Sequence, residues 1–193
     1  MRELLEVLSG IFLVAAFFPY ITGIVKKETQ PAKASWLIWV VLDFITLAGM
    51  YAADVINGQI VGATIGSTVV AVLALHFGKP GWTKLDLSCL LGAAAGFILW
   101  RVLDSPLMGI LVSQGINFLG SVPTVVSAWE YPNRESRGTW ILFWFSCVFT
   151  VASVRRWSLE GAVQPITFFL IGSAMLYVVL LRPWLRNLVP RDV

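Results

Sequence analysis

The hydrophobic positions of this chain fall into seven long runs that are separated by short polar or charged segments. A helix needs roughly 20 mostly apolar residues to cross the hydrocarbon core of a bilayer. The pattern therefore predicts seven transmembrane helices, at about residues 4–25, 34–53, 57–78, 85–103, 105–129, 138–154 and 161–181. The fourth run is the shortest, because Asp86 and Arg101 flank its uncharged part, and it needs snorkelling ends or a locally thinner bilayer.

Composition supports this assignment. Apolar residues make up 58% of the 193 residues and charged residues only 13%, whereas a soluble domain has about a quarter charged residues. We therefore expect an all-α membrane protein with no separate soluble catalytic domain. Cys89 and Cys147 both lie within apolar runs, which favours packing roles over a disulfide or a metal site.

The basic residues predict the orientation of the chain in the membrane. With seven spans, ten Lys and Arg residues fall on one side and four on the other; without the fourth span the division becomes eight against six. Because cytoplasmic loops are enriched in Lys and Arg, the N-terminus is predicted outside and the C-terminus in the cytoplasm, most simply in the plasma (inner) membrane. Their scatter over span ends does not predict binding to nucleic acid.

The two ends of the sequence repeat one another. Pro19 and Pro123 are 104 positions apart, and so are Trp36 and Trp140. The segment Ile65-Gly-Ser67 recurs as Ile171-Gly-Ser173 with a shift of only two further positions. We therefore expect a first three-helix repeat at 1–83, a linker helix at 84–104, and a second repeat with a short cytoplasmic tail at 105–193. Because three is odd, the linker gives both repeats the same orientation.

This layout resembles the SWEET and PQ-loop superfamily of transporters, of which the chain would be a divergent member. The shared features are a proline near the cytoplasmic end of the first helix, a basic loop, and a polar and aromatic start to the second helix. The chain has Pro19-Tyr20 and Pro123-Thr124 where PQ-loop proteins have Pro-Gln, and it lacks the helix prolines and asparagines of sugar carriers. Nicotinamide riboside transporters share a related architecture and are another candidate relative.

Polar residues at mid-depth are the candidates for a binding site. An ionisable group inside the membrane is costly, so Asp43 is either a solute-binding and proton-cycling group or a structural acid paired with a neighbouring helix. Asn117 and Gln114 lie one turn apart on the fifth helix, and Thr68 and Ser173 lie in the third and seventh. The predicted substrate-binding residues are Asp43, Asn117, Gln114, Trp39, Trp144, Thr68 and Ser173.

Three further residues are candidates for gating. Pro19 and Pro123 interrupt the hydrogen-bond ladders of the first and fifth helices, either as hinges or as static bends. His76 lies at the cytoplasmic end of the third helix, as a titrating gate or as a solvated interfacial residue. The small residues of Gly92-Ala-Ala-Ala-Gly96 predict close packing of the fourth helix on a neighbour.

These residues favour a transporter that moves a small polar solute by rocking two repeats around a midplane site. The alternative is a receptor or cargo-binding protein on the same scaffold, as in the KDEL-receptor branch. A retinal protein is excluded because the five lysines lie at loops or span ends. A single His and the lack of paired acids favour neither an enzyme nor a metal site, and no cofactor is expected. One chain holds both repeats, so a monomer suffices, while a homo-oligomer stays open.

Overall fold

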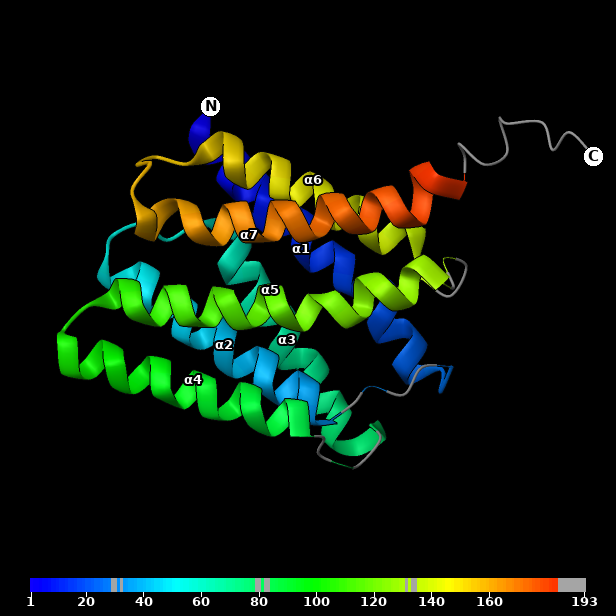
Figure 1. The fold of residues 1–193 in the computed structure, drawn as a ribbon. Coiled ribbons are helices and arrows are strands. Elements are labelled where there is room, and N and C mark those ends of the chain that lie inside the picture. Colours follow the sequence, from blue (N-terminus) through cyan, green and yellow to red (C-terminus); the bar gives the residue numbers. More distant parts are fainter. Residues whose placement is uncertain are drawn as a thin grey trace, which may run out of the picture.

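The computed structural model describes residues 1–28, 31, 33–78, 81, 84–130, 132 and 135–183, with the side chains at 85, 86, 89, 122, 123 and 127 left out. Over these residues the chain is helical and contains no strand (Figure 1). The helices are α1 (Arg2–Val25), α2 (Lys33–Ala52), α3 (Gly58–Phe77), α4 (Lys84–Leu103), α5 (Pro106–Glu130), α6 (Arg137–Ser153) and α7 (Leu159–Leu176), which continues into the π-helical turn η2 (Tyr177–Leu181). Their bounds agree closely with the predicted spans.

The helix ends follow from local sequence. Lys27, Asp54 and Asp104 adopt positive φ just after α1, α2 and α4, where a left-handed residue lets the chain turn out of a helix. At helix starts, the side chains of Asn57, Ser136 and Ser158 accept a hydrogen bond from a backbone N–H of the first turn. The fully described connections, at 53–57, 104–105 and 154–158, are short.

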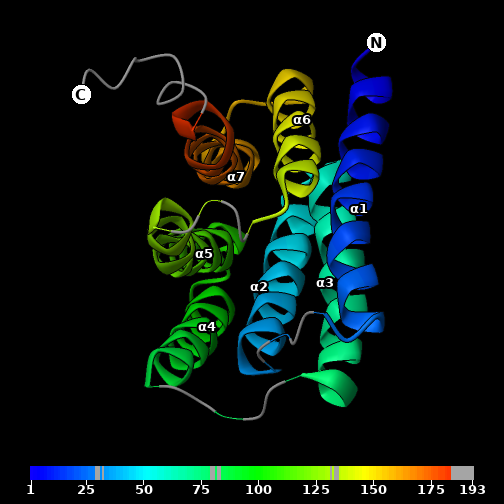
Figure 2. The same ribbon diagram turned by 90° about the vertical axis from the view of Figure 1, so that its right-hand side faces the viewer.

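Successive helices run in opposite directions, so the loops gather at two ends of the molecule (Figure 1). The N-terminal face carries Met1 and the turns at 53–57, 104–105 and 154–158. The C-terminal face carries the ends of α1, α3 and α5, the starts of α2, α4 and α6, and Arg182. The helices are not all parallel: α4, α5 and α7 are seen nearly end-on in Figure 2, while α1, α2, α3 and α6 run across the view.

Two sets of helices are named here by their packing. In the first bundle, α3 packs against both α1 and α2; in the second bundle, α7 packs against both α5 and α6. The bundles meet where α1 contacts α6, which is the most extensive contact between helices in the described chain, and where α2 contacts α5. Helix α4 packs mainly on α5 and less extensively on α2.

Among the described residues, five helices are long and apolar enough to cross a bilayer: α1, α2, α3, α5, and α7 together with η2. Their windows are only 17–50% buried within the protein, so apolar side chains cover much of the surface. This confirms the prediction of several membrane-spanning helices. The two remaining predicted spans are less complete, since α6 has 17 residues and α4 contains a shorter apolar helix, Leu90–Leu103.

Glycines permit close helix packing at two places. A Cβ at Gly96 would come within 2.7 Å of Val112, so the predicted small-residue face of α4 packs on α5. A second face, Gly58, Gly62 and Gly66 of α3, was not singled out in the sequence and packs on α1. A Cβ at Gly58 would lie 1.9 Å from the carbonyl oxygen of Glu6.

Candidate functional site

The predicted acid, Asp43, lies at the middle of α2 and is 6% exposed. Its carboxyl group interacts with the hydroxyl of Ser67, which is buried at the middle of α3. Asp43 is thus held inside the first bundle by a neutral hydroxyl rather than by a cation. The alternative prediction was a structural acid paired with a neighbouring helix. The partner on that helix is the neutral hydroxyl of Ser67.

Gln114 and Asn117 come to the same level from the second bundle. Gln114 is 1% exposed, and its Nε2 donates a hydrogen bond of 3.0 Å to Oγ1 of the buried Thr46 in α2. Helices α2 and α5 are antiparallel. Asp43 precedes Thr46 by three residues and Asn117 follows Gln114 by three, so both are displaced from this bond towards the C-terminal face by about the same amount. The observed bond across the α2/α5 boundary is the one between Gln114 and Thr46, and helix register places Asp43 and Asn117 one turn from it.

The other predicted binding residues lie in separate contacts. Trp144 donates a hydrogen bond of 3.2 Å to Ser173, which joins α6 to α7. The ring of Trp39 lies edge-on to Trp36 at 4.9 Å and packs on two apolar clusters, one within the first bundle and one shared with α4 and α5. The hydroxyl of Thr68 donates to the Thr64 carbonyl within α3, at 2.6 Å. None of these contacts reaches Asp43, and the packing reading of the tryptophans is the one that their neighbours support.

The predicted gating residues are dispersed. Pro19 lies within α1, which continues past it to Val25, and its side chain is exposed. Pro123 belongs to α5, but its side chain lies outside the described residues. His76 is exposed in the last turn of α3, with its ring 6.5 Å from that of Phe77. They form no cluster with one another in the part of the chain that is described.

The most extensive polar arrangement was not singled out in the sequence. It is a directed chain of four hydrogen bonds, here called the amide chain, close to the N-terminal face. Asn57 Nδ2 donates to Gln164 Oε1 at 2.8 Å, and Gln164 Nε2 donates to Gln59 Oε1 at 2.9 Å. Gln59 Nε2 donates to Ser146 Oγ at 3.1 Å, and Ser146 Oγ donates to the Ser9 carbonyl at 2.7 Å. Every one of these bonds joins the first bundle to the second.

The sequence contains a pattern from which the amide chain could have been predicted. Gln59 and Gln164 occupy the first two turns of α3 and α7, 105 positions apart, which is nearly the repeat offset. An amide in an apolar helix needs partners. The prediction examined polar residues only at mid-depth and therefore missed them. Cys147 also accepts a bond from Gln59 Nε2, at 3.2 Å, and is otherwise packed in the core, which agrees with its predicted packing role.

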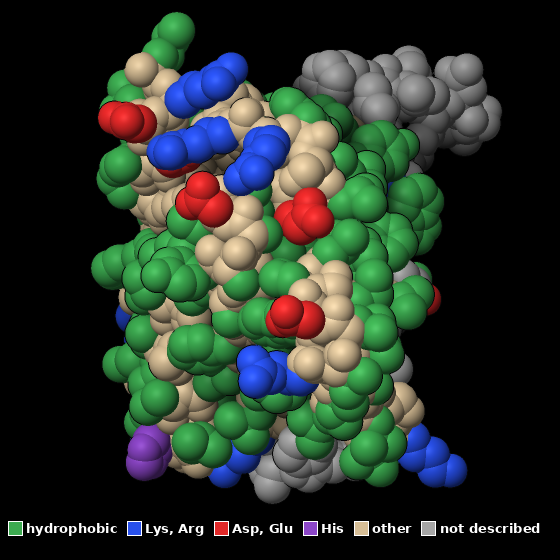
Figure 3. Space-filling model, turned by 90° about the vertical axis from the view of Figure 1, so that its left-hand side faces the viewer, with side chains coloured by type: hydrophobic (Ala, Val, Ile, Leu, Met, Phe, Trp, Pro, Cys, Tyr) green, Lys and Arg blue, Asp and Glu red, His purple; other side chains and the backbone are tan. Residues whose placement is uncertain are grey.

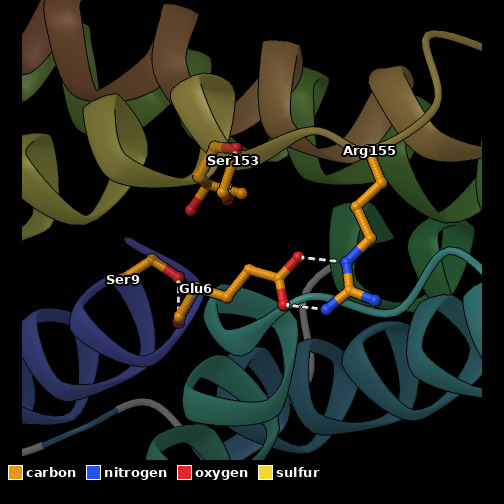
Figure 4. Close-up of polar contacts among 5 residues, drawn as sticks. Glu6, Ser9, Ser153 and Arg155 are labelled. Carbon is orange, nitrogen blue, oxygen red and sulfur yellow. Dashed lines mark hydrogen bonds and ion pairs between the residues drawn. The ribbon is translucent and has the colours of Figure 1, made fainter. Parts of the chain in front are cut away.

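Ion pairs extend the same connection to the surface of the N-terminal face. Arg155, in the α6–α7 turn, donates through Nε and Nη2 to the two carboxylate oxygens of Glu6, each at 2.7 Å (Figure 4). This hydrogen-bonded contact raises the pKa of Arg155 above its usual value. Arg156 donates to the Asp54 carbonyl at 3.2 Å. Figure 3 shows acidic and basic side chains gathered over this face.

Apolar packing also connects the bundles. One cluster, built on Leu13, Met50, Ile110 and Phe168, takes residues from both bundles on the N-terminal side. Another, built on Ile38, Leu42 and Ala93, joins α2 and α4 and packs with Ile116 of α5. Towards the C-terminal face each bundle also has a cluster of its own. The first is built around Ile24, Trp36 and Val70, and the second around Ala128, Met175 and Val179. The inter-bundle bonds named above likewise lie between mid-level and the N-terminal face.

No group of three or more His, Cys, Asp or Glu that would hold a metal ion occurs among the described residues. No protein-family model, curated protein or solved structure matches this chain. The case for function therefore depends on the geometry of the two bundles and of the polar residues between them.

Proposed function

We propose that this protein is a transporter that moves a small polar solute through the bilayer by rocking the two bundles around a midplane site. The observation that carries the proposal is the one-sided distribution of the hydrogen bonds between the bundles, which are concentrated on the N-terminal side together with a common core. Alternating access requires such an asymmetry, because one side of a binding site must be closed while the other is open.

The pattern of helix contacts supports two equivalent parallel repeats, as in SWEET and PQ-loop carriers. The proposed repeat relates α1 to α5, α2 to α6 and α3 to α7. Under this relation the α1/α6 boundary corresponds to the α5/α2 boundary. The same relation turns the order α1–α3–α2 into α5–α7–α6. This is the relation expected from a two-fold axis along the membrane normal, with α4 as the linker span. All seven helices would then cross the membrane, including the short α6.

Charge supports the orientation proposed from the sequence. Among the described residues, the C-terminal face carries six basic side chains against three acidic ones, and the N-terminal face four against five. The excess of positive charge favours a cytoplasmic C-terminal face. The amide chain then closes the site towards the outside, and solute would exchange with the cytoplasm.

Asp43 would be the coupling group. Ionisation of a buried carboxyl group without a cationic partner costs free energy. A bound solute or a conformational change alters this cost, because each changes the surroundings of the carboxyl group. Binding and release of a proton at Asp43 would thereby be linked to the rocking movement.

Reconstitution tests the proposal. We expect uptake of at least one compound from a panel of isotope-labelled small polar solutes into proteoliposomes, accelerated by a proton gradient. Asp43→Asn should lower this uptake at least about tenfold, because a change of about 1.4 kcal/mol is already tenfold in rate. The matched control, Asp104→Asn, lies in an exposed turn that Asn also tolerates, and should retain uptake.

The receptor alternative predicts a different outcome of the same experiment. Saturable binding of a panel compound without any flux would favour a receptor and contradict the transporter. Uptake that is unchanged in Asp43→Asn and independent of the proton gradient would exclude coupling through this residue.

A further inference from the structure

Two buried polar atoms at the α2/α5 boundary have no hydrogen-bond partner among the residues that the structure describes. They are Oε1 of Gln114 and Nδ2 of Asn117, and both are shielded from solvent. A buried polar atom without a hydrogen bond costs about 1–3 kcal/mol. Two such atoms lie one turn apart on one helix, and the Gln114 side chain to which one belongs is 1% exposed.

Their neighbours define the chemistry of the space between them. The Nε2 of Gln114 is already bonded to Thr46, which leaves its Oε1 as an acceptor. Asn117 contributes a donor, and Asp43, one turn from Thr46 on α2, interacts with the hydroxyl of Ser67. No Lys, Arg or His occurs in the middle of α2 or α5.

We infer that Gln114, Asn117 and Asp43 form a recognition site for a neutral solute group that offers a hydrogen-bond donor next to an acceptor, namely a hydroxyl or a primary or cyclic amide. This inference depends on the proposed function and names the class of its solute. The acceptor of the solute bonds to Asn117 Nδ2, and its donors bond to Gln114 Oε1 and to the Asp43 carboxyl.

Charged solutes do not fit this set of partners. An ammonium group has donors but no acceptor, so it leaves Asn117 Nδ2 unpaired. A carboxylate has acceptors but no donor, so it leaves Gln114 Oε1 unpaired and lies beside Asp43 with no cation to offset the repulsion. Only a group with both functions satisfies both orphan atoms.

The site lies on the C-terminal side of the amide chain. Asp43 and Asn117 are displaced from the Thr46–Gln114 bond towards the C-terminal face, beside the apolar cluster of Ile38, Leu42 and Ala93 with Ile116. Solute that enters from the C-terminal face would therefore have to separate this cluster.

Thermal unfolding of the purified protein in detergent, without any flux measurement, tests the site. The neutral probes are uracil, acetamide and D-ribose; the charged probes are succinate and putrescine, all at the same high concentration. We expect at least one neutral probe to raise the melting temperature by about 2 °C or more, because a ligand of the native state stabilises it. Neither charged probe should do so.

Two variants separate recognition from stability. Asn117→Leu and Thr139→Val each remove a buried orphan polar atom, so both should keep or raise the melting temperature without ligand. Only Asn117→Leu should abolish the shift caused by the neutral probe. Gln114→Glu should reduce it, because it adds a second acid beside the site.

Three results would overturn the inference. The melting temperature could rise with succinate or putrescine alone, it could rise with none of the probes, or its rise with a neutral probe could persist in Asn117→Leu. Each can occur while proteoliposome uptake persists, so failure of the solute class is distinguishable from failure of the transporter proposal.

Discussion

Side-chain type decides how a polar residue behaves in these apolar helices. The hydroxyls of Thr64, Thr68 and Thr150 each donate to a carbonyl one turn earlier in their own helix, so they need no neighbour. Gln59 and Gln164 have longer side chains with both donors and acceptors, and each is completely buried. They satisfy one another, which makes the pair a connection between bundles rather than a local feature.

The two glutamines should therefore be strongly coupled. Gln164→Leu leaves Asn57 Nδ2 and Gln59 Oε1 unpaired, at about 1–3 kcal/mol each. The double variant Gln59→Leu with Gln164→Leu removes most of these orphan atoms, so its loss of stability should fall at least ~1 kcal/mol short of the sum of the single losses. Denaturant unfolding in detergent measures this cycle.

Ser88 provides the control for that cycle. Its exposed hydroxyl donates only to the Lys84 carbonyl in the same helix, so Ser88→Ala combined with Gln164→Leu should be additive. Additivity of the two glutamine variants would show that the amide chain does not act as a unit.

At the scale of the helices, α3 owes its place to its glycines. Gly58, Gly62 and Gly66 recur every four residues and so face one side, where the backbone of α1 approaches at Glu6 and Gly10 and the ring of Phe17 packs. This close approach places α3 between α1 and α2, and it carries Gln59 to the boundary between the bundles. Packing of small residues thus positions the amide chain.

A methyl group on this face should separate α1 from α3. Gly58→Ala places a Cβ against the Glu6 carbonyl, and because a backbone atom cannot rotate away, we expect a loss of roughly 1–3 kcal/mol. A Cβ at Gly115 of α5 meets nothing within 4 Å, so Gly115→Ala should leave stability unchanged or raise it by up to about 1 kcal/mol. Melting temperatures in detergent compare the two, and equal losses would contradict the proposed role of α3.

At the scale of the whole molecule, the hydrogen bonds between the two bundles are concentrated on one side. The Glu6–Arg155 pair lies at the surface, where solvent screens the attraction, so it orients the bundles more than it holds them. The amide chain and the shared core supply most of the connection. The boundary between the bundles thus has a screened ion pair at the surface and hydrogen bonds with apolar packing below it. Such non-covalent contacts allow the boundary to open and close.

Covalent closure of the N-terminal face should stop transport. In a background without native cysteines, Glu6→Cys with Arg155→Cys joins the bundles when a short bifunctional thiol reagent is added. Proteoliposome uptake should fall at least about tenfold and recover on reduction. The control pair, Trp129→Cys with Arg182→Cys, lies within the second bundle, where Arg182 is 3.7 Å from the Trp129 ring, and its cross-link should leave uptake intact. Uptake that survives the first cross-link would rule out opening at this face.

The sequence by itself determined the helices and their bounds, because long apolar runs and charged or turn-forming ends act locally. It also selected Asp43, Gln114 and Asn117, since mid-depth polar residues are costly and few. Only the tertiary structure decided which polar residues meet: Trp144, Thr68 and Ser173 bond within single bundles, while Gln59 and Gln164 bridge the two. The physical reason is that a hydrogen bond between distant helices depends on their relative position and rotation, which close packing at Gly58, Gly62 and Gly66 fixes and hydropathy does not encode.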